Sequence, residues 1–186
     1  MNPWGAAAIG LWAVLAVASL RVWAPRPRAT RPVTRRPPAL VGILAMEVGL
    51  TGLVAGFGAQ SGSLDAPWSW AAVGIGAVAA VTTGGAVVLS MFGLVDASSR
   101  SGSARVQRTI LRGGAWIGAL ERLAMVATIL AGWPEGILGI VTIKAFARYP
   151  ELKTGQGSGA TERFIIGSFA SLGWAAGCAG VVMILL

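Results

Sequence analysis

The chain contains no histidine and one cysteine, Cys178, and both scarcities restrict its chemistry. Without histidine there can be no Ser-His-Asp triad, no His-ligated zinc and no HExxH metalloprotease motif. A single cysteine excludes an internal disulfide, and we interpret Cys178 as a small apolar filler of a helix. A Walker Gly-Lys-Ser/Thr motif is missing, as are the paired aspartates that would hold magnesium for lipid phosphotransfer. The sequence therefore predicts no metal site, no cofactor and no evident enzymatic chemistry.

Charge is also scarce, since only 12% of the 186 residues are charged and 55% are apolar. Soluble domains average about 25% charged residues. Glycine is abundant, with 27 residues, which is costly in soluble helices but common in membrane helices that pack closely. The composition predicts one all-α domain, a polytopic bundle of membrane helices spanning residues 1–186.

Six apolar stretches are candidates for crossing the bilayer. They cover residues 3–23, 39–59, 68–95, 113–132, 135–148 and 163–186. The fifth would form a helix of only about 21 Å, whereas the hydrocarbon core is about 30 Å thick. Residues 113–148 therefore either cross as two helices or form a re-entrant hairpin around Trp133-Pro134. Both alternatives leave the chain ends on the same sides of the membrane.

The basic residues indicate the orientation. With the exception of Arg122, every Lys and Arg lies in or beside three connectors, which cover residues 24–38, 96–112 and 149–162. Such loops are cytoplasmic by the positive-inside rule, so both termini are expected outside. This orientation accounts for the net charge of +8 without nucleic-acid binding. The Arg-over-Lys bias and the Ala, Gly and Val richness hint at a GC-rich bacterial genome. We therefore expect a multi-pass protein of the bacterial cytoplasmic (inner) membrane.

Ionisable residues within the apolar stretches are the candidate functional residues, because each costs several kcal/mol unless it is paired or hydrated. They are Glu47, Glu121, Arg122 and Lys144, with Arg148 and Glu162 at the inner rim. We predict that Glu121 pairs with Lys144, and that Arg122 or Arg148 pairs with Glu162 or Glu47. Because neighbouring residues point about 100° apart on a helix, Glu121 and Arg122 need different partners.

Three interpretations of these charges stay open. In the first, they are buried ion pairs that fix helix register, with little net effect on stability. Glu47, Glu121 and Lys144 would instead form a proton or solute relay. Arg148, Lys153 and Arg163 would bind lipid head groups or a partner at the inner surface. A Ser–Lys nucleophile built from Lys144 with Ser168 or Ser171 would require a neutral lysine at matching depth.

Three pairs of glycines with GxxxG spacing, one in each of three spans, suggest how the helices pack. They are Gly52 and Gly56, Gly114 and Gly118, and Gly173 and Gly177. Each pair places two glycines on one helix face, where another backbone can approach closely. We expect a compact bundle from this pattern.

Charged motifs in the C-terminal third resemble a known pattern. They are Gly114-Ala-Trp-Ile-Gly118-Ala-Leu-Glu121-Arg122, Lys144-Ala-Phe-Ala-Arg148-Tyr and Glu162-Arg163-Phe-Ile-Ile-Gly167-Ser168 with Ser171. Over residues 113–175 the chain is similar to an uncharacterised bacterial inner-membrane family, catalogued only as a domain of unknown function. It departs at Arg163 and Ser168, where that family favours an aromatic residue and threonine. The resemblance implies that the five ordered charges Glu121, Arg122, Lys144, Arg148 and Glu162 act as a set, and it implies no reaction.

Two functions are compatible with these features. The small size, the glycine pairs and the arginine-rich connectors favour a membrane scaffold or a subunit of a larger complex. Its partners would be the lipid bilayer and a membrane or cytosolic protein or further copies of itself. The intramembrane Glu47, Glu121 and Lys144 favour instead a small ion, proton or solute transporter. A water-filled cavity at the glutamates would support transport, and dry, cation-bonded glutamates would support the scaffold.

Overall fold

A computed structural model describes residues 2–23, 37–98, 113–153 and 158–186, and within these residues the secondary structure is entirely helical. The helices are α1 (Pro3–Trp23), α2 (Pro37–Ser61), α3 (Trp68–Ser98), α4 (Gly113–Leu130), α5 (Pro134–Lys153) and α6 (Ser158–Leu185). The predicted all-α class is therefore confirmed for the described part of the chain.

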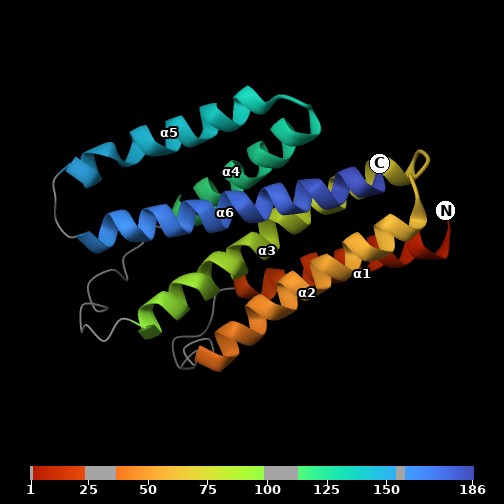
Figure 1. The fold of residues 1–186 in the computed structure, drawn as a ribbon, viewed down its shortest axis with the longest axis horizontal. Coiled ribbons are helices and arrows are strands. Elements are labelled where there is room, and N and C mark those ends of the chain that lie inside the picture. Colours follow the sequence, from red (N-terminus) through yellow and green to blue (C-terminus); the bar gives the residue numbers. More distant parts are fainter. Residues whose placement is uncertain (1, 24–36, 99–112, 154–157) are drawn as a thin grey trace.

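Successive helices run in opposite directions, so the bundle has two distinct ends (Figure 1). Both chain termini lie at the same end, together with the turn between α2 and α3 and the turn between α4 and α5. The helix ends that flank residues 24–36, 99–112 and 154–157 lie toward the opposite end. The fold thus separates the ends that border the basic segments from the ends that border short, nearly uncharged turns.

Helix α3 is central, because it packs against α1, α2, α4 and α6, whereas α5 lies at the edge against α4 (Figure 1). One apolar core joins these helices, with Trp12, Val54, Ala79 and Val182 fully buried in it. Small residues on α3 allow this packing. A Cβ added to Gly76 would lie 2.4 Å from Val182 Cγ2, so only glycine fits there without displacing α6.

In the described part of the chain, four helices contain a segment long and apolar enough to cross a membrane: Pro3–Leu20, Pro38–Ser61, Trp68–Val95 and Phe164–Leu185. The bundle surface is apolar as well, with side chains such as Phe169, Ile143 and Trp70 more than 70% exposed. Water would not favour such a surface, whereas hydrocarbon would. Exposed tryptophans at the starts of α1 and α3 and in the α4–α5 turn lie toward the end that holds the termini, as an interfacial aromatic belt does.

The fifth helix is longer than the sequence suggested. It covers 20 residues rather than the predicted 14 of residues 135–148, and its length of about 30 Å matches the hydrocarbon core. Helix α6 starts at Ser158 rather than 163, so the predicted connector over residues 149–162 shrinks to residues 154–157. A charged residue ends an apolar run in the sequence, but it does not have to end the helix. The backbone hydrogen bonds continue as long as the long charged side chain can reach a polar surface.

The prediction that the glycine pairs bring neighbouring helices together is not met within the bundle. A Cβ added to Gly52, Gly56, Gly173 or Gly177 would meet nothing within 4 Å, and one added to Gly118 would meet only Arg122 of its own helix. The close approaches occur instead at glycines of α3 that lie outside these pairs, such as Gly76 and Gly84. Spacing alone identifies a bare helix face but does not determine whether that face points inward.

Candidate functional site

The turn between α4 and α5 determines which charged residues meet. Gly132 adopts a left-handed backbone with φ of +63°, and Trp133 N donates to Thr128 O at 2.9 Å, which closes the last turn of α4. Pro134 then begins α5, a position that favours proline. The result is an antiparallel hairpin. Glu121 and Lys144 stand at nearly equal distances along the chain from this turn, so the hairpin brings them opposite each other.

Glu121 and Lys144 form an ion pair, in which Lys144 Nζ donates to Glu121 Oε2. The two side chains are only 15% and 17% exposed, so the pair lies between α4 and α5 rather than on the surface. This is the pairing expected from the sequence. It leaves Lys144 engaged with a carboxylate, which does not suit the neutral amine that a Ser–Lys nucleophile requires.

Arg122 points the other way, toward α3 and α6, and is 4% exposed. Its Nη1 donates to Ser171 Oγ of α6 at 3.2 Å, while its Nε lacks a hydrogen-bond partner among the described residues. The expected ion pair of Arg122 with Glu47 or Glu162 is therefore not formed. The reason is topological: Glu47 lies on α2 against α1, and Glu162 lies exposed near the start of α6.

The space for the Arg122 side chain comes from Gly84 on α3. A Cβ at this position would lie 2.5 Å from Arg122 Cδ and 2.9 Å from Arg122 Nε. Beside it, Trp174 Nε1 of α6 donates to Thr83 Oγ1 at 2.7 Å, and Thr83 Oγ1 donates to the carbonyl of Ala79 at 2.6 Å. We call Thr83, Gly84, Arg122, Ser171 and Trp174 the Arg122 cluster. It joins three helices by polar contacts in an otherwise apolar interior.

Glu47 is 1% exposed and lies between α1 and α2. Ser19 Oγ lies 2.9 Å from Glu47 Oε1, to which it donates, and also 2.9 Å from the carbonyl oxygen of Leu15. Glu47 Oε2 has no hydrogen-bond partner, and no ion pair of Glu47 occurs among the described side chains. Among the described side chains, Glu47 is thus a buried carboxyl group held by the hydroxyl of Ser19.

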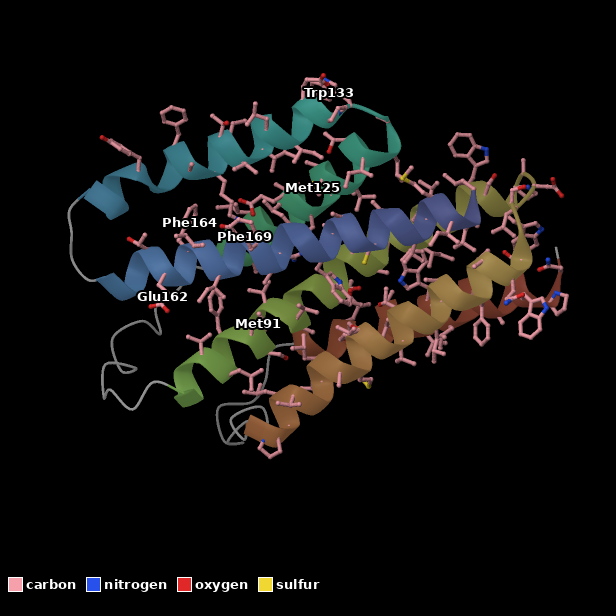
Figure 2. The ribbon with its side chains drawn as sticks, in the orientation of Figure 1. Met91, Met125, Trp133, Glu162, Phe164 and Phe169 are labelled. Atoms are coloured by element: carbon pink, nitrogen blue, oxygen red, sulfur yellow. The ribbon has the colours of Figure 1, made fainter. Side chains whose placement is uncertain are left out.

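The remaining predicted residues lie toward the end of the bundle that borders the basic segments, opposite the chain termini. Figure 2 shows Glu162 near the start of α6, beside Phe164 and far from the α4–α5 turn marked by Trp133. The backbones of Arg148 and Lys153 belong to α5 and that of Arg163 to α6, and their side chains are outside the described residues. The structure therefore brings together Glu121 with Lys144, and leaves Arg122, Glu47 and Glu162 in three separate environments.

The surface grooves formed by the described helices include two that no carboxyl or basic side chain lines. One lies between α2 and α6, with Val48, Thr51 and Gly177 among its lining residues. The other lies between α1 and α3 and is lined by Ala13, Ala16, Val17, Gly74, Ile75 and Val78. Glu47, Glu121 and Arg122 therefore face neither groove.

Sequence reasoning missed most partners of the buried charges. Ser19, Thr83, Gly84 and Trp174 read individually as ordinary residues of apolar helices, and nothing in their spacing links them to Glu47 or Arg122. The one available signal was that a buried arginine needs hydrogen-bond acceptors and space for its side chain. Polar residues and glycines of other spans are therefore candidates for contacts with Arg122.

Taken together, these features define a helical bundle with an apolar surface, at least four helices able to cross a membrane, and charges held in its interior. No family model matches the chain, and no curated protein or solved structure matches it either.

Proposed function

We propose that this protein is a membrane scaffold, a subunit whose role is to hold itself or a partner in the bilayer. The observation that carries the proposal is the Glu121–Lys144 ion pair, in which the intramembrane glutamate is already neutralised by an intramembrane lysine. A transport site must exchange such partners for a solute or for protons, and must be reached from water. The two described grooves are apolar and reach none of the buried charges.

The proposal includes six crossings of a bacterial inner membrane with both ends outside. Helices α4 and α5, at about 27 Å and 30 Å, are each long enough to span the core or nearly so. Their ion pair faces the partner helix, and α5 presents Leu138, Ile143 and Phe146 outward, as a lipid-facing helix does. The charge difference between the two ends of the bundle supports the orientation.

Cysteine labelling tests the orientation directly, because Cys178→Ala alone yields a cysteine-free background. In intact cells, a membrane-impermeant maleimide should label Ser63→Cys, which lies in the α2–α3 turn. It should leave Thr30→Cys and Ser103→Cys unlabelled until the cells are opened. Labelling of Thr30→Cys or Ser103→Cys in intact cells would overturn the orientation.

Gentle detergent extraction followed by affinity capture and mass spectrometry tests the scaffold role. We expect a second protein, or further copies of the chain, to be recovered in a fixed ratio. Recovery of only the isolated monomer, from membranes in which it is expressed at its native level, would count against the proposal.

The second candidate function is a small ion or proton transporter, and one observation favours it. Glu47 Oε2 is buried without a hydrogen-bond partner among the described residues, and such a group is a usable proton site. If the chain transports protons, purified protein in liposomes should show pH-dependent flux that Glu47→Gln or Glu121→Gln abolishes. No flux from the native chain over a panel of ions would exclude this role.

A further inference from the structure

The contact between Glu47 and Ser19 is an interior contact that the proposed function does not use. Glu47 is 1% exposed and Ser19 is 4% exposed, so both side chains are shielded from their surroundings. Ser19 Oγ lies 2.9 Å from Glu47 Oε1 of α2 and 2.9 Å from the carbonyl oxygen of Leu15, one turn earlier on α1. Both distances are normal for a hydrogen bond between two oxygens. The serine oxygen therefore has two oxygen neighbours, and each contact needs a hydrogen.

Counting hydrogens identifies the donor in each of these contacts. A serine hydroxyl carries one hydrogen, and the Leu15 carbonyl carries none. If Glu47 were ionised, Ser19 could donate to only one neighbour, and the other pair of oxygens would lie 2.9 Å apart with no hydrogen between them. If Glu47 is a carboxylic acid, it donates to Ser19 Oγ while Ser19 donates to Leu15. The protonated acid is the form that satisfies both contacts at once.

The Arg122 cluster contains the same arrangement with a donor that cannot be mistaken. Trp174 Nε1, which can only donate, bonds to Thr83 Oγ1 at 2.7 Å, and Thr83 Oγ1 donates to the carbonyl of Ala79 at 2.6 Å. In both places a helical hydroxyl contacts the carbonyl four residues earlier, as such hydroxyls commonly do. Glu47 stands toward Ser19 where the N–H group of Trp174 stands toward Thr83, so Glu47 is the donor.

The surroundings of Glu47 also suit a neutral acid. Its Oε2 is buried without a hydrogen-bond partner among the described residues, and an ionised oxygen left in this way costs more than the carbonyl oxygen of an acid.

The helices packed against α2 bring no described positive charge to this site. They are α1, α3 and α6, and among their described side chains the titratable group that interacts with Glu47 is the Cys178 thiol. The other charged residues of these helices are Glu162, which is exposed, and Arg21, Asp96 and Arg163, whose side chains lie outside the described residues.

We infer that Glu47 is a neutral carboxylic acid at neutral pH, and that Glu47, Ser19 and the Leu15 carbonyl form a proton-binding site that fastens α1 to α2. On deprotonation the O–H bond of Glu47 breaks, the proton passes to a base in the solution, and one negative charge stays on the carboxylate. Ser19 must then donate to Glu47 and lose its bond to Leu15, which loosens the contact. This inference is independent of the proposed scaffold, because it concerns only how one buried side chain is held.

Infrared spectroscopy tests the protonation state directly, because a carboxylic acid and a carboxylate have different carbonyl stretches. The native chain is measured at neutral pH in a detergent without ester or carboxyl groups. We expect an acid band that Glu47→Gln removes and that Ser19→Ala shifts to higher frequency, since the acid then loses its acceptor. The matched control is Glu121→Gln, which should leave the band unchanged because Glu121 is paired with Lys144.

Three outcomes would overturn the inference. They are no acid band in the native chain, a band that survives Glu47→Gln, and a band that Ser19→Ala does not move. Arg21→Gln should leave the band as it is. A band that appears only in Arg21→Gln would show that Arg21 holds Glu47 ionised, which also contradicts the inference.

The pH dependence of unfolding tests whether the proton fastens the helices. Because the folded chain holds a proton that the unfolded chain releases, unfolding becomes more favourable as the pH rises. In the Cys178→Ala background, which removes the buried thiol as a second titrating group, the unfolding equilibrium constant should rise by up to about tenfold per pH unit between about pH 6 and 8. Tryptophan fluorescence follows the unfolding, and adding Glu47→Gln should remove this dependence. Equal slopes with and without Glu47→Gln, or a stability that rises with pH, would refute the inference.

Discussion

Gly84→Ala tests whether the Arg122 cluster holds α3, α4 and α6 together. The added methyl would lie 2.5 Å from Arg122 Cδ, 2.9 Å from Arg122 Nε and 3.2 Å from Trp174 Cδ1. The arginine must then shift, which costs about 1–3 kcal/mol of overpacking. It also risks its bond to Ser171, worth about 1.5–3 kcal/mol for a charged donor. Because relaxation relieves part of both terms, we expect a loss of about 2–4 kcal/mol of unfolding free energy.

The chain carries its own reporter for this measurement. Cys178 is 1% exposed, so a thiol-reactive fluorophore should label it only when the bundle unfolds on heating in detergent. Gly74→Ala is the matched control, because Gly74 lies on the same helix and an added Cβ there meets nothing within 4 Å. Equal unfolding temperatures for Gly84→Ala and Gly74→Ala would refute the reasoning. So would an undiminished effect of Gly84→Ala in an Arg122→Ala background, where the clashing side chain is gone.

The same assay checks three further predictions. Lys144→Met should destabilise the chain by about 3–5 kcal/mol, because it leaves the mostly buried Glu121 carboxylate without its cation. Adding Glu121→Gln should recover most of that loss, and a double variant no more stable than Lys144→Met alone would contradict this explanation. Glu47→Gln should cost under about 1 kcal/mol, because its amide still bonds to Ser19, whereas Glu47→Leu, which has no polar atom, should cost more. Ser171→Ala should lower the unfolding free energy by about 1–3 kcal/mol, because it leaves Arg122 without its described acceptor. A change within experimental error would show that the Arg122–Ser171 hydrogen bond does not contribute to stability.

The helical class and the positions of the helices followed from the sequence. The sequence predicts residues 3–23 as the first helix, and α1 has the same bounds, because an apolar run that begins at a proline and meets its first charge at Arg21 leaves little ambiguity. The Glu121–Lys144 pair was also predictable, since a short turn at Trp133-Pro134 forces residues equally distant from it to meet. Local signals suffice where the contact is close in sequence.

The partners of Arg122 and Glu47 were not predictable: the expected ion pair of Arg122 with Glu47 or Glu162 does not form, and the alternative pairs of Arg148 involve a side chain outside the described residues. Ser171 lies 49 residues from Arg122, and Ser19 lies 28 residues from Glu47. Which helix faces these residues depends on how α1 packs against α2 and how α6 packs against α4. A single serine in an apolar run gives no sign in the sequence of which helix it contacts. The role of Gly84 was not predictable for the same reason, because it depends on the side chains of Arg122 and Trp174 that pack against it from other helices.

The sequence by itself determined the elements: apolar runs too long for a small soluble core, basic residues in every second connector, and charges that must be satisfied within the bundle. Only the tertiary structure decided how they are used. It set Glu121 against α5 and Arg122 against α3 and α6, and it left Gly52, Gly173 and Gly177 bare on one groove instead of between packed helices. The physical reason is that hydrophobicity determines which segments leave water, whereas the fit of side chains across helices determines which faces meet.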